Sequence, residues 1–294
     1  MNENNRGYVQ VFFAGFLWGT IGIFATLLGD MGLSSSEISF FRLLSASSLL
    51  ALVLLVKGKG LSLFRISKKG LISCMLIGFI SQAIYNIFYM GAVNMTGMST
   101  AAVLLYTSPV FVMLLSRIFF KEKITFLKFF AIILNILGCV LVVTGGDFSG
   151  IKVAFIGIVF GVMAGFTYGL MPIFSRLGAD DENAFTSAFY GLFFGMVALF
   201  FIARPYQGVS APFTMNMLLV IIGFGLIPSA IAYIIYFGGL SKVKETSIIP
   251  VLCSVENVAA SIFGFLVFHE SFTFLKVVGV ALVFISIMVI NLKK

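Results

Sequence analysis

The chain has 294 residues, of which 60% are hydrophobic and only 10% are charged. A soluble domain of this length cannot bury so much apolar surface, so the composition excludes a soluble protein and indicates a polytopic membrane protein. The net charge of +8 would suit a nucleic-acid partner. The basic residues instead follow the pattern of a membrane topology, described below, and we expect no nucleic acid to bind.

Ten stretches are apolar and long enough to cross a bilayer, which takes about 20 residues. The runs are continuous rather than alternating, so they predict transmembrane helices and an all-α integral membrane protein, not a barrel. The first run lacks a clear small-residue cleavage site, which predicts a retained span rather than a signal peptide. The predicted spans are 9–29, 36–56, 70–91, 98–119, 124–144, 151–172, 183–203, 215–238, 246–268 and 273–291.

One seven-residue segment occurs twice. Residues 122–128 read EKITFLK and residues 270–276 read ESFTFLK, so that five of seven positions are identical. Further Gly and aromatic pairs at similar offsets indicate an internal duplication. We therefore predict one repeat at 1–148 and a second at 149–294, each with five spans. Because five is odd, the second repeat enters the membrane from the opposite side, and the two are inverted, as in many secondary transporters.

Lys and Arg residues concentrate in the loops on one side of the predicted membrane. The opposite side carries only Lys152, Arg204 and Lys276. This imbalance predicts that the richer side is cytoplasmic and that both termini of the multi-pass chain are inside. The fifteen basic residues of the richer side are Arg6, Lys57, Lys59, Arg65, Lys68, Lys69, Arg117, Lys121, Lys123, Lys128, Arg176, Lys242, Lys244, Lys293 and Lys294.

Several short motifs are distributed over the two halves. They are Trp18-Gly19, Arg42, Ser108-Pro109, the turn ending in Glu122, Tyr168, and the turn with Glu270. With these motifs the chain resembles the drug/metabolite transporter superfamily, in its EamA-type branch with ten helices, over essentially its whole length. The resemblance implies an inner-membrane carrier, commonly an exporter of amino acids or other small metabolites, and does not fix the substrate.

The chain departs from the family's pattern in the ninth predicted span. The family often has an acidic residue followed by Pro there, whereas this sequence reads Glu256-Asn257. The acid is kept and the Pro is lost, so the nearby Pro250 becomes the candidate for a local bend.

Polar and aromatic side chains form stripes at helical spacing. Gln82, Tyr85, Asn86 and Tyr89 fall on one face, and similar stripes occur in the fourth, eighth and ninth spans. Because lipid-facing surfaces are apolar, the stripes mark the bundle interior. They either line a central substrate cavity or hydrogen bond between helices without a ligand. The predicted substrate-binding residues are Trp18, Arg42, Gln82, Tyr85, Asn86, Tyr89, Tyr106, Tyr168, Tyr233, Tyr236 and Asn257.

Two charged residues lie within the spans. Glu256 is near the middle of its span, where an ionised carboxylate costs several kcal/mol. It is the candidate proton-coupling residue, and the alternative is a structural carboxyl that only packs. Arg42 lies about two turns into its span. It either holds a substrate carboxylate, pairs with Glu256, or extends to the interface.

Glycines recur at close spacing in two spans, as Gly157, Gly161, Gly165 and Gly169 in the sixth and as Gly15, Gly19 and Gly22 in the first. Small residues at this spacing let helices approach closely. The interface that they form is either a sliding surface or static packing.

These features predict a secondary active transporter that exports a small molecule by alternating access, with protons as the candidate counter-substrate. An uncoupled facilitator or channel, or a lipid scramblase, would fit the same scaffold. We expect no enzyme, because the spans offer one mid-membrane acid, no mid-membrane His and no phosphate-binding loop. Cys74, Cys139 and Cys253 lack metal-ligand spacing, so no metal or cofactor is predicted. The partners are a small-molecule substrate and the lipid bilayer, and both a monomer and a homodimer are open.

Overall fold

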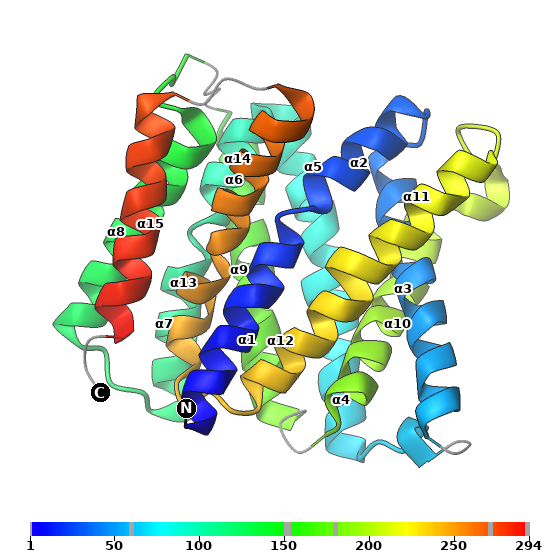
Figure 1. The fold of residues 1–294 in the computed structure, drawn as a ribbon, viewed down its shortest axis with the longest axis horizontal. Helices are drawn as coiled ribbons and strands as arrows, with labels where there is room; N and C mark the ends of the chain where they lie inside the picture. The colour runs from blue at the N-terminus through cyan, green and yellow to red at the C-terminus, as the bar shows by residue number, and fades with distance from the viewer. Residues whose placement is uncertain (1, 59–61, 150–153, 179–181, 270–272, 292–294) are drawn as a thin grey trace.

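A computed structural model describes residues 2–58, 62–149, 154–178, 182–269 and 273–291. In these ranges the chain is a bundle of helices (Figure 1). Nine described helices are long and apolar enough to cross a membrane, and a further apolar helix, α15, completes the bundle. The all-α membrane architecture is therefore confirmed. The predicted Glu270 turn and Lys59, Lys152, Lys293 and Lys294 lie outside the described residues.

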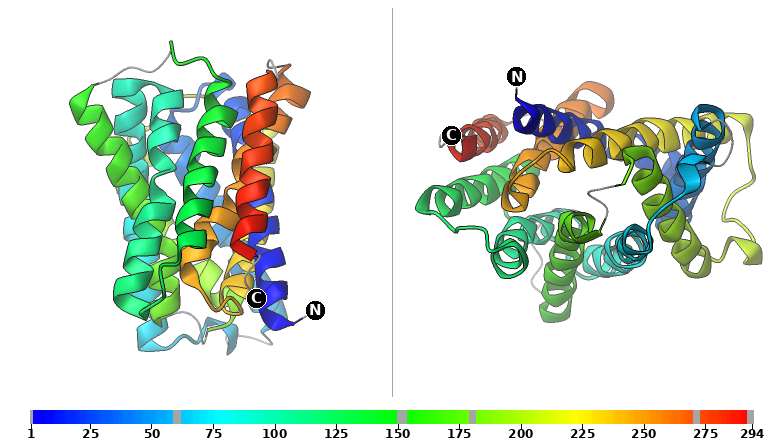
Figure 2. Two further views of the ribbon diagram at one scale, coloured as in Figure 1. Left: turned by 90° about the vertical axis from the view of Figure 1, so that its left-hand side faces the viewer. Right: turned by 90° about the horizontal axis from the view of Figure 1, so that it is seen from below.

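The first five spans alternate between the two ends of the bundle. We call the end at which α1 begins and α15 ends the basal end, and the opposite one the apical end (Figure 2). The elements are α1 (Glu3–Trp18), α2 (Ile21–Asp30), α3 (Ser35–Lys57), η1 (Ser62–Phe64), α4 (Lys68–Leu76), the π-helical η2 (Ile77–Ile84), α5 (Tyr85–Thr96), α6 (Met98–Leu105), α7 (Ser108–Phe120) and α8 (Phe126–Thr144).

The second five spans run in the opposite sense, since α9 begins at the apical end and α1 at the basal end. Their elements are α9 (Phe155–Gly178), α10 (Ala184–Ala203), η3 (Pro205–Gln207), α11 (Met215–Gly225), the π-helical η4 (Leu226–Ile231), α12 (Ala232–Leu240), η5 (Thr246–Ile248), α13 (Ile249–Cys253), α14 (Val255–Phe268) and α15 (Phe274–Asn291).

Capping residues explain where the helices begin and end. The Asn2 side chain accepts a hydrogen bond from the Asn5 amide at 2.8 Å, so α1 begins earlier than the predicted position 9. The third span runs over Lys68–Thr96 rather than 70–91. Ser67 caps its start, and Gly97, with a φ of 86°, ends it.

The packing of the helices follows the duplication. α1 packs on α12 as α5 packs on α9, and α8 pairs with α15. The irregular features correspond as well: η2 matches η4, and the left-handed residues Lys121 and His269, with φ of 56° and 55°, end α7 and α14. The fold is therefore two inverted five-helix repeats. The division at residue 148 stays a prediction.

Among the spans that are divided into two helices, the fourth and the ninth break at corresponding places. In the fourth span the Thr107 hydroxyl donates to the Leu104 carbonyl at 2.7 Å, between α6 and α7. In the ninth the Ser254 hydroxyl donates to the Val251 carbonyl at 2.7 Å, between α13 and α14. Such back-bonding competes with the helical ladder and bends helices. The break thus lies at Ser254 and not at Pro250, which occupies the first turn of α13, where a missing N–H costs little.

The predicted glycines bring α1 and α9 against the broken spans. A Cβ atom added to Gly19 would lie 2.4 Å from the Cβ of Ala259, and one added to Gly161 would lie 2.5 Å from the nearest Leu104 carbon. Both distances are far inside van der Waals contact. The close approach of α1 to α14, and of α9 to α6, therefore requires glycine at these positions.

Candidate functional site

A cavity of about 240 Å³ lies in the middle of the bundle, between spans of both repeats. Trp18, the last residue of α1, and Tyr168, at mid-length of α9, lie at its basal side. From there the lining extends towards the apical end, to Gly22 on α2 and Ala260 on α14. The cavity thus has a floor near the middle of the bundle and lies in its apical half.

Ten of the twelve residues predicted to bind substrate or couple protons line this cavity. They are Trp18, Arg42, Gln82, Tyr85, Tyr89, Tyr106, Tyr168, Tyr233, Glu256 and Asn257. The structure places the remaining two elsewhere. The Asn86 amide donates to the Ser39 hydroxyl at 2.9 Å, between α5 and α3. Tyr236 lies on the basal side of Trp18, with ring centres 5.1 Å apart.

Aromatic rings form much of the cavity wall. Trp18 contacts the Tyr233 ring edge-on at 5.4 Å. Across the cavity, Tyr85 stacks on Tyr89 at 5.7 Å and contacts Tyr168 at 5.6 Å. Such pairs hold one another in place through large contact areas and preferred ring geometry. The walls are therefore rigid, apolar surfaces that carry hydroxyl groups.

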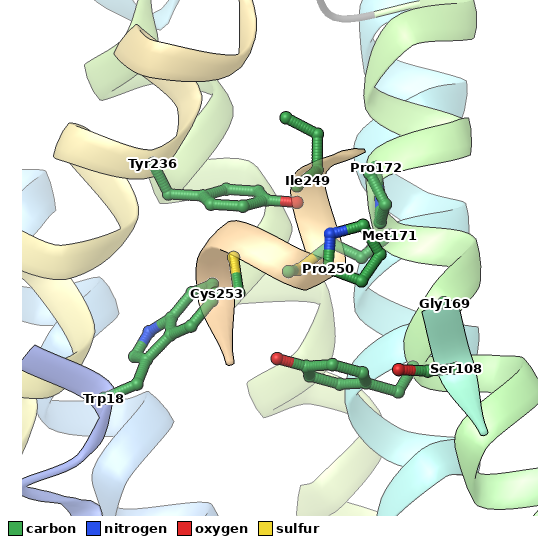
Figure 3. Close-up of a pocket in the computed structure, with 10 residues that line it drawn as sticks. Trp18, Ser108, Gly169, Met171, Pro172, Tyr236, Ile249, Pro250 and Cys253 are labelled. Carbon is green, nitrogen blue, oxygen red and sulfur yellow. The ribbon is translucent and has the colours of Figure 1, made fainter. Parts of the chain in front are cut away.

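The free space almost vanishes on the basal side of Trp18. The next pocket in that direction measures only about 10 Å³. Figure 3 shows the side chains that fill it, with the Tyr236 and Trp18 rings on one side and Pro172 and Ser108 on the other, around Cys253 and Pro250. These side chains come from α1, α7, α9, α12 and α13. The bundle is thus closed towards the basal end.

Two side chains that can carry opposite charges face the cavity without forming an ion pair. Glu256 lies in the first turn of α14, directly after the break at Ser254. The Arg42 guanidinium lies over the Phe224 ring, 5.7 Å from its centre. No ion pair joins Arg42 to Glu256 in the part of the chain that the structure describes, and the Nε of Arg42 has no hydrogen-bond partner. A buried donor without a partner is costly, so Arg42 has hydrogen-bonding capacity left for a ligand.

Other polar side chains of the cavity form hydrogen bonds that link the two repeats. The Gln82 amide donates to the Tyr233 hydroxyl at 2.5 Å, and the Tyr106 hydroxyl donates to the Asn257 amide oxygen. These two bonds each join the first repeat to the second across the cavity. They orient the side chains, so that the site is preorganised before any ligand arrives.

Sequence reasoning missed six of the lining residues, namely Gly19, Ile21, Gly22, Ser81, Leu105 and Ala260. Most are small or apolar and carry no chemical signal of their own. Ser81 is the exception: it lies one position before the predicted Gln82 stripe, and its buried hydroxyl has no hydrogen-bond partner. Gly22 adjoins open space, since an added Cβ would meet nothing within 4 Å.

Nothing in the described ranges forms a metal centre, since no three His, Cys, Asp or Glu side chains group together there. The three cysteines are free and buried. The site therefore offers hydrogen bonds, charge and aromatic surface for binding.

Comparison with known proteins identifies the family. The model of the EamA-like transporter family matches residues 5–144 and again residues 155–292. An uncharacterized transporter from Archaeoglobus fulgidus is 25% identical over 283 residues, which are 96% of this chain and 95% of the relative. The uncharacterized inner membrane transporter YicL from Salmonella typhimurium is 21% identical over 296 residues, covering 99% and 97% of the two chains.

A solved crystal structure shares the fold, with a TM-score of 0.81 at 15% identity and 98% of each chain covered. The two family matches together span nearly the whole sequence and coincide with the two structural repeats. The chain therefore belongs to the EamA-like transporter family and is a multi-pass membrane transporter.

Proposed function

We propose that the protein is a secondary carrier that exports amino acids or similar small zwitterions across the plasma membrane by alternating access. The observation that carries the proposal is the presence of Arg42 and Glu256, unpaired with each other, in one aromatic-walled cavity. A zwitterion supplies a carboxylate for Arg42 and an ammonium group for Glu256. Its side chain would lie against the Tyr and Trp rings.

Proton coupling follows from the same geometry. Glu256 is the one carboxylate among the residues that line the cavity. A proton and a substrate ammonium group would compete for it, because each neutralises a charge that is expensive at that depth. Such competition at one site gives exchange of substrate for proton without further machinery.

The test is transport in proteoliposomes under an imposed pH gradient, with radiolabelled amino acids as substrates. The wild type is expected to accumulate substrate against its gradient, with saturable, trans-stimulated exchange. Glu256→Gln keeps the shape and cannot titrate, so it is expected to abolish accumulation while leaving downhill exchange. Accumulation by Glu256→Gln would remove Glu256 as the coupling residue.

The same vesicles separate the other functions that this scaffold allows. A channel gives flux that neither saturates nor responds to substrate on the far side. A scramblase moves a fluorescent phospholipid between the leaflets, and a carrier does not. Either result in the wild type would overturn the proposed exporter.

A further inference from the structure

At the basal end, Glu122 holds the beginning of the ninth span. Its carboxylate accepts hydrogen bonds from the Thr246 amide at 2.6 Å, the Ser247 amide at 3.1 Å and the Ser247 hydroxyl at 2.5 Å. Only 8% of the side chain is exposed. Amide groups at the start of a helix lack partners within the helix, so a carboxylate there supplies both the missing acceptor and a favourable charge.

Two cations complete this cluster. Lys128 lies 3.8 Å from Glu122 and 3.2 Å from Glu245, and donates to the Ser247 hydroxyl at 3.1 Å. Arg176 lies 3.7 Å from Glu122 and donates to the Thr246 hydroxyl at 2.9 Å. The cluster therefore joins the turn after α7, the start of α8, the end of α9 and the start of η5. It ties the first repeat to the second.

The cluster joins three of the five helices that close the cavity, namely α7, α9 and the segment that leads into α13. The side chains on the basal side of Trp18 include Ser108 from α7, Pro172 from α9 and Pro250 from α13. Glu122 follows the C-terminal end of α7, Arg176 lies near that of α9, and Thr246 begins the segment that leads into α13. A path from the cavity to the basal end runs beside these three helices, with α1 and α12 on its other side. The intact cluster keeps the basal ends of α7, α9 and the segment before α13 together on that side of the path.

We propose that Glu122 is the latch of the closed basal end: its contacts hold the present state, and they must break before the cavity opens to that side. The latch has a role in transport only if the protein works by alternating access, as proposed above. The closed geometry itself does not depend on which substrate is transported. Removing one member of a buried charge cluster leaves the remaining charges without compensation. Loss of the Glu122 charge therefore favours separation of the basal ends.

Cys253 serves as a natural reporter of this opening. It is 5% exposed and lies among the side chains that fill the basal side of the floor. Cys74 is fully buried between α4 and α10, where its thiol faces the Ser187 carbonyl at 3.8 Å. Opening of the latch would expose Cys253, whereas general loosening of the fold would expose both. Labelling at each cysteine is measured separately by mass spectrometry of peptides.

Glu182 provides a matched control. It also lies at the basal end, and it also accepts a hydrogen bond from the amide before a helix, that of Ser67, at 2.9 Å. It likewise joins the two repeats, but through α4 and α10, which contribute no side chain to the filled space beside Cys253.

The experiment measures maleimide labelling of the purified full-length protein in detergent. Glu122→Gln is expected to label at Cys253 roughly tenfold faster than the wild type, with the Cys74 rate unchanged. Arg176→Gln is expected to act in the same direction, and Glu182→Gln is expected to leave the Cys253 rate at the wild-type value. Unchanged Cys253 rates in both latch variants, an equal rise at Cys74, or an equal effect of Glu182→Gln would each overturn the latch.

This measurement needs no transported substrate. If the wild type transports none of the amino acids tested while the latch variants still expose Cys253, the proposed function fails and the latch stands. If transport is coupled as proposed while labelling does not respond, the latch fails alone.

Discussion

Gly22 lines the cavity at a position where a side chain would reduce the cavity volume. It lies in the lining, and a Cβ atom there would meet nothing within 4 Å. Leucine at this position would extend into the cavity without displacing the protein around it.

Gly22→Leu is therefore expected to lower transport on the order of tenfold or more by occupying space that the substrate needs, with little change in thermal stability. Gly29→Leu is the matched control. It lies on the same helix, and its position is equally open, but it does not line the cavity. Uptake rates and thermal unfolding of both variants in detergent check the prediction. Equal transport by the two variants would contradict it.

Helical spacing correctly predicts most residues of the candidate site, but its prediction for Asn86 is wrong. The spacing placed Gln82, Tyr85 and Tyr89 on one face, and the structure puts all three in the cavity wall. Gln82, however, belongs to the π-helical η2, which ends two residues before Asn86. The wider turn changes the rotation between the two positions, and Asn86 faces Ser39 instead. Nothing in the sequence marks a π-helical turn.

Among the elements, α8 and α15 pack backbone against backbone at two facing glycines. A Cβ atom added to Gly138 would lie 2.9 Å from the Gly279 carbonyl, and one added to Gly279 would lie 2.8 Å from the Gly138 carbonyl. Asn135 strengthens the pair, because its amide donates to Ser286 at 3.0 Å and to Ser254 at 2.6 Å. The paired backbones leave no room for a methyl group.

Gly279→Ala is expected to cost roughly 1–3 kcal/mol, because the two helices must move apart. Gly191→Ala is the control, since its added Cβ would lie 3.5 Å from the nearest atom, an ordinary contact. The melting temperature in detergent should fall for Gly279→Ala and not for Gly191→Ala. A fall in neither variant would show that α8 and α15 separate at no cost.

The order of the elements could be read from hydropathy and from the repeat of EKITFLK, but the helix breaks could not. The sequence pointed to Pro250 as the bend of its span, whereas the backbone divides at Ser254. A proline in the first turn of a helix is compatible with helical geometry. A serine hydroxyl can donate to any of several acceptors. Only the packed structure determines that it bonds to a carbonyl of the preceding turn.

For the whole molecule, the inversion explains why equivalent residues have different surroundings. Tyr89 and Tyr236 occupy matching places in the two repeats, yet Tyr89 lines the cavity and Tyr236 lies on the closed side of Trp18. Their helices run in opposite directions, so the two residues lie at opposite depths. Pattern analysis cannot foresee this difference, because it depends on which end of the bundle is open.

Orientation in the membrane is a further prediction at this scale. Among the described loop and end residues, Arg204 and Lys276 are the basic residues of the apical end, and the others lie at the basal end. We therefore expect the basal end to face the cytoplasm and the cavity to face outward. A reporter fused after Lys294 should read cytoplasmic, and one in the 204–212 loop external. A cytoplasmic signal from that loop would contradict the inverted insertion.

The matching positions of the π-helical segments η2 and η4 also bear on how the duplicated chain arose. Such a segment is in effect one extra residue within an α-helix, and it survives because neighbouring groups adjust to it; the Ser229 hydroxyl, for example, donates to the Phe224 carbonyl at 3.1 Å. Both repeats carry the segment at the same place in the third of their five spans. One insertion before the gene duplicated accounts for both copies. On that account, the five-helix unit carried the π-helical segment before it was duplicated.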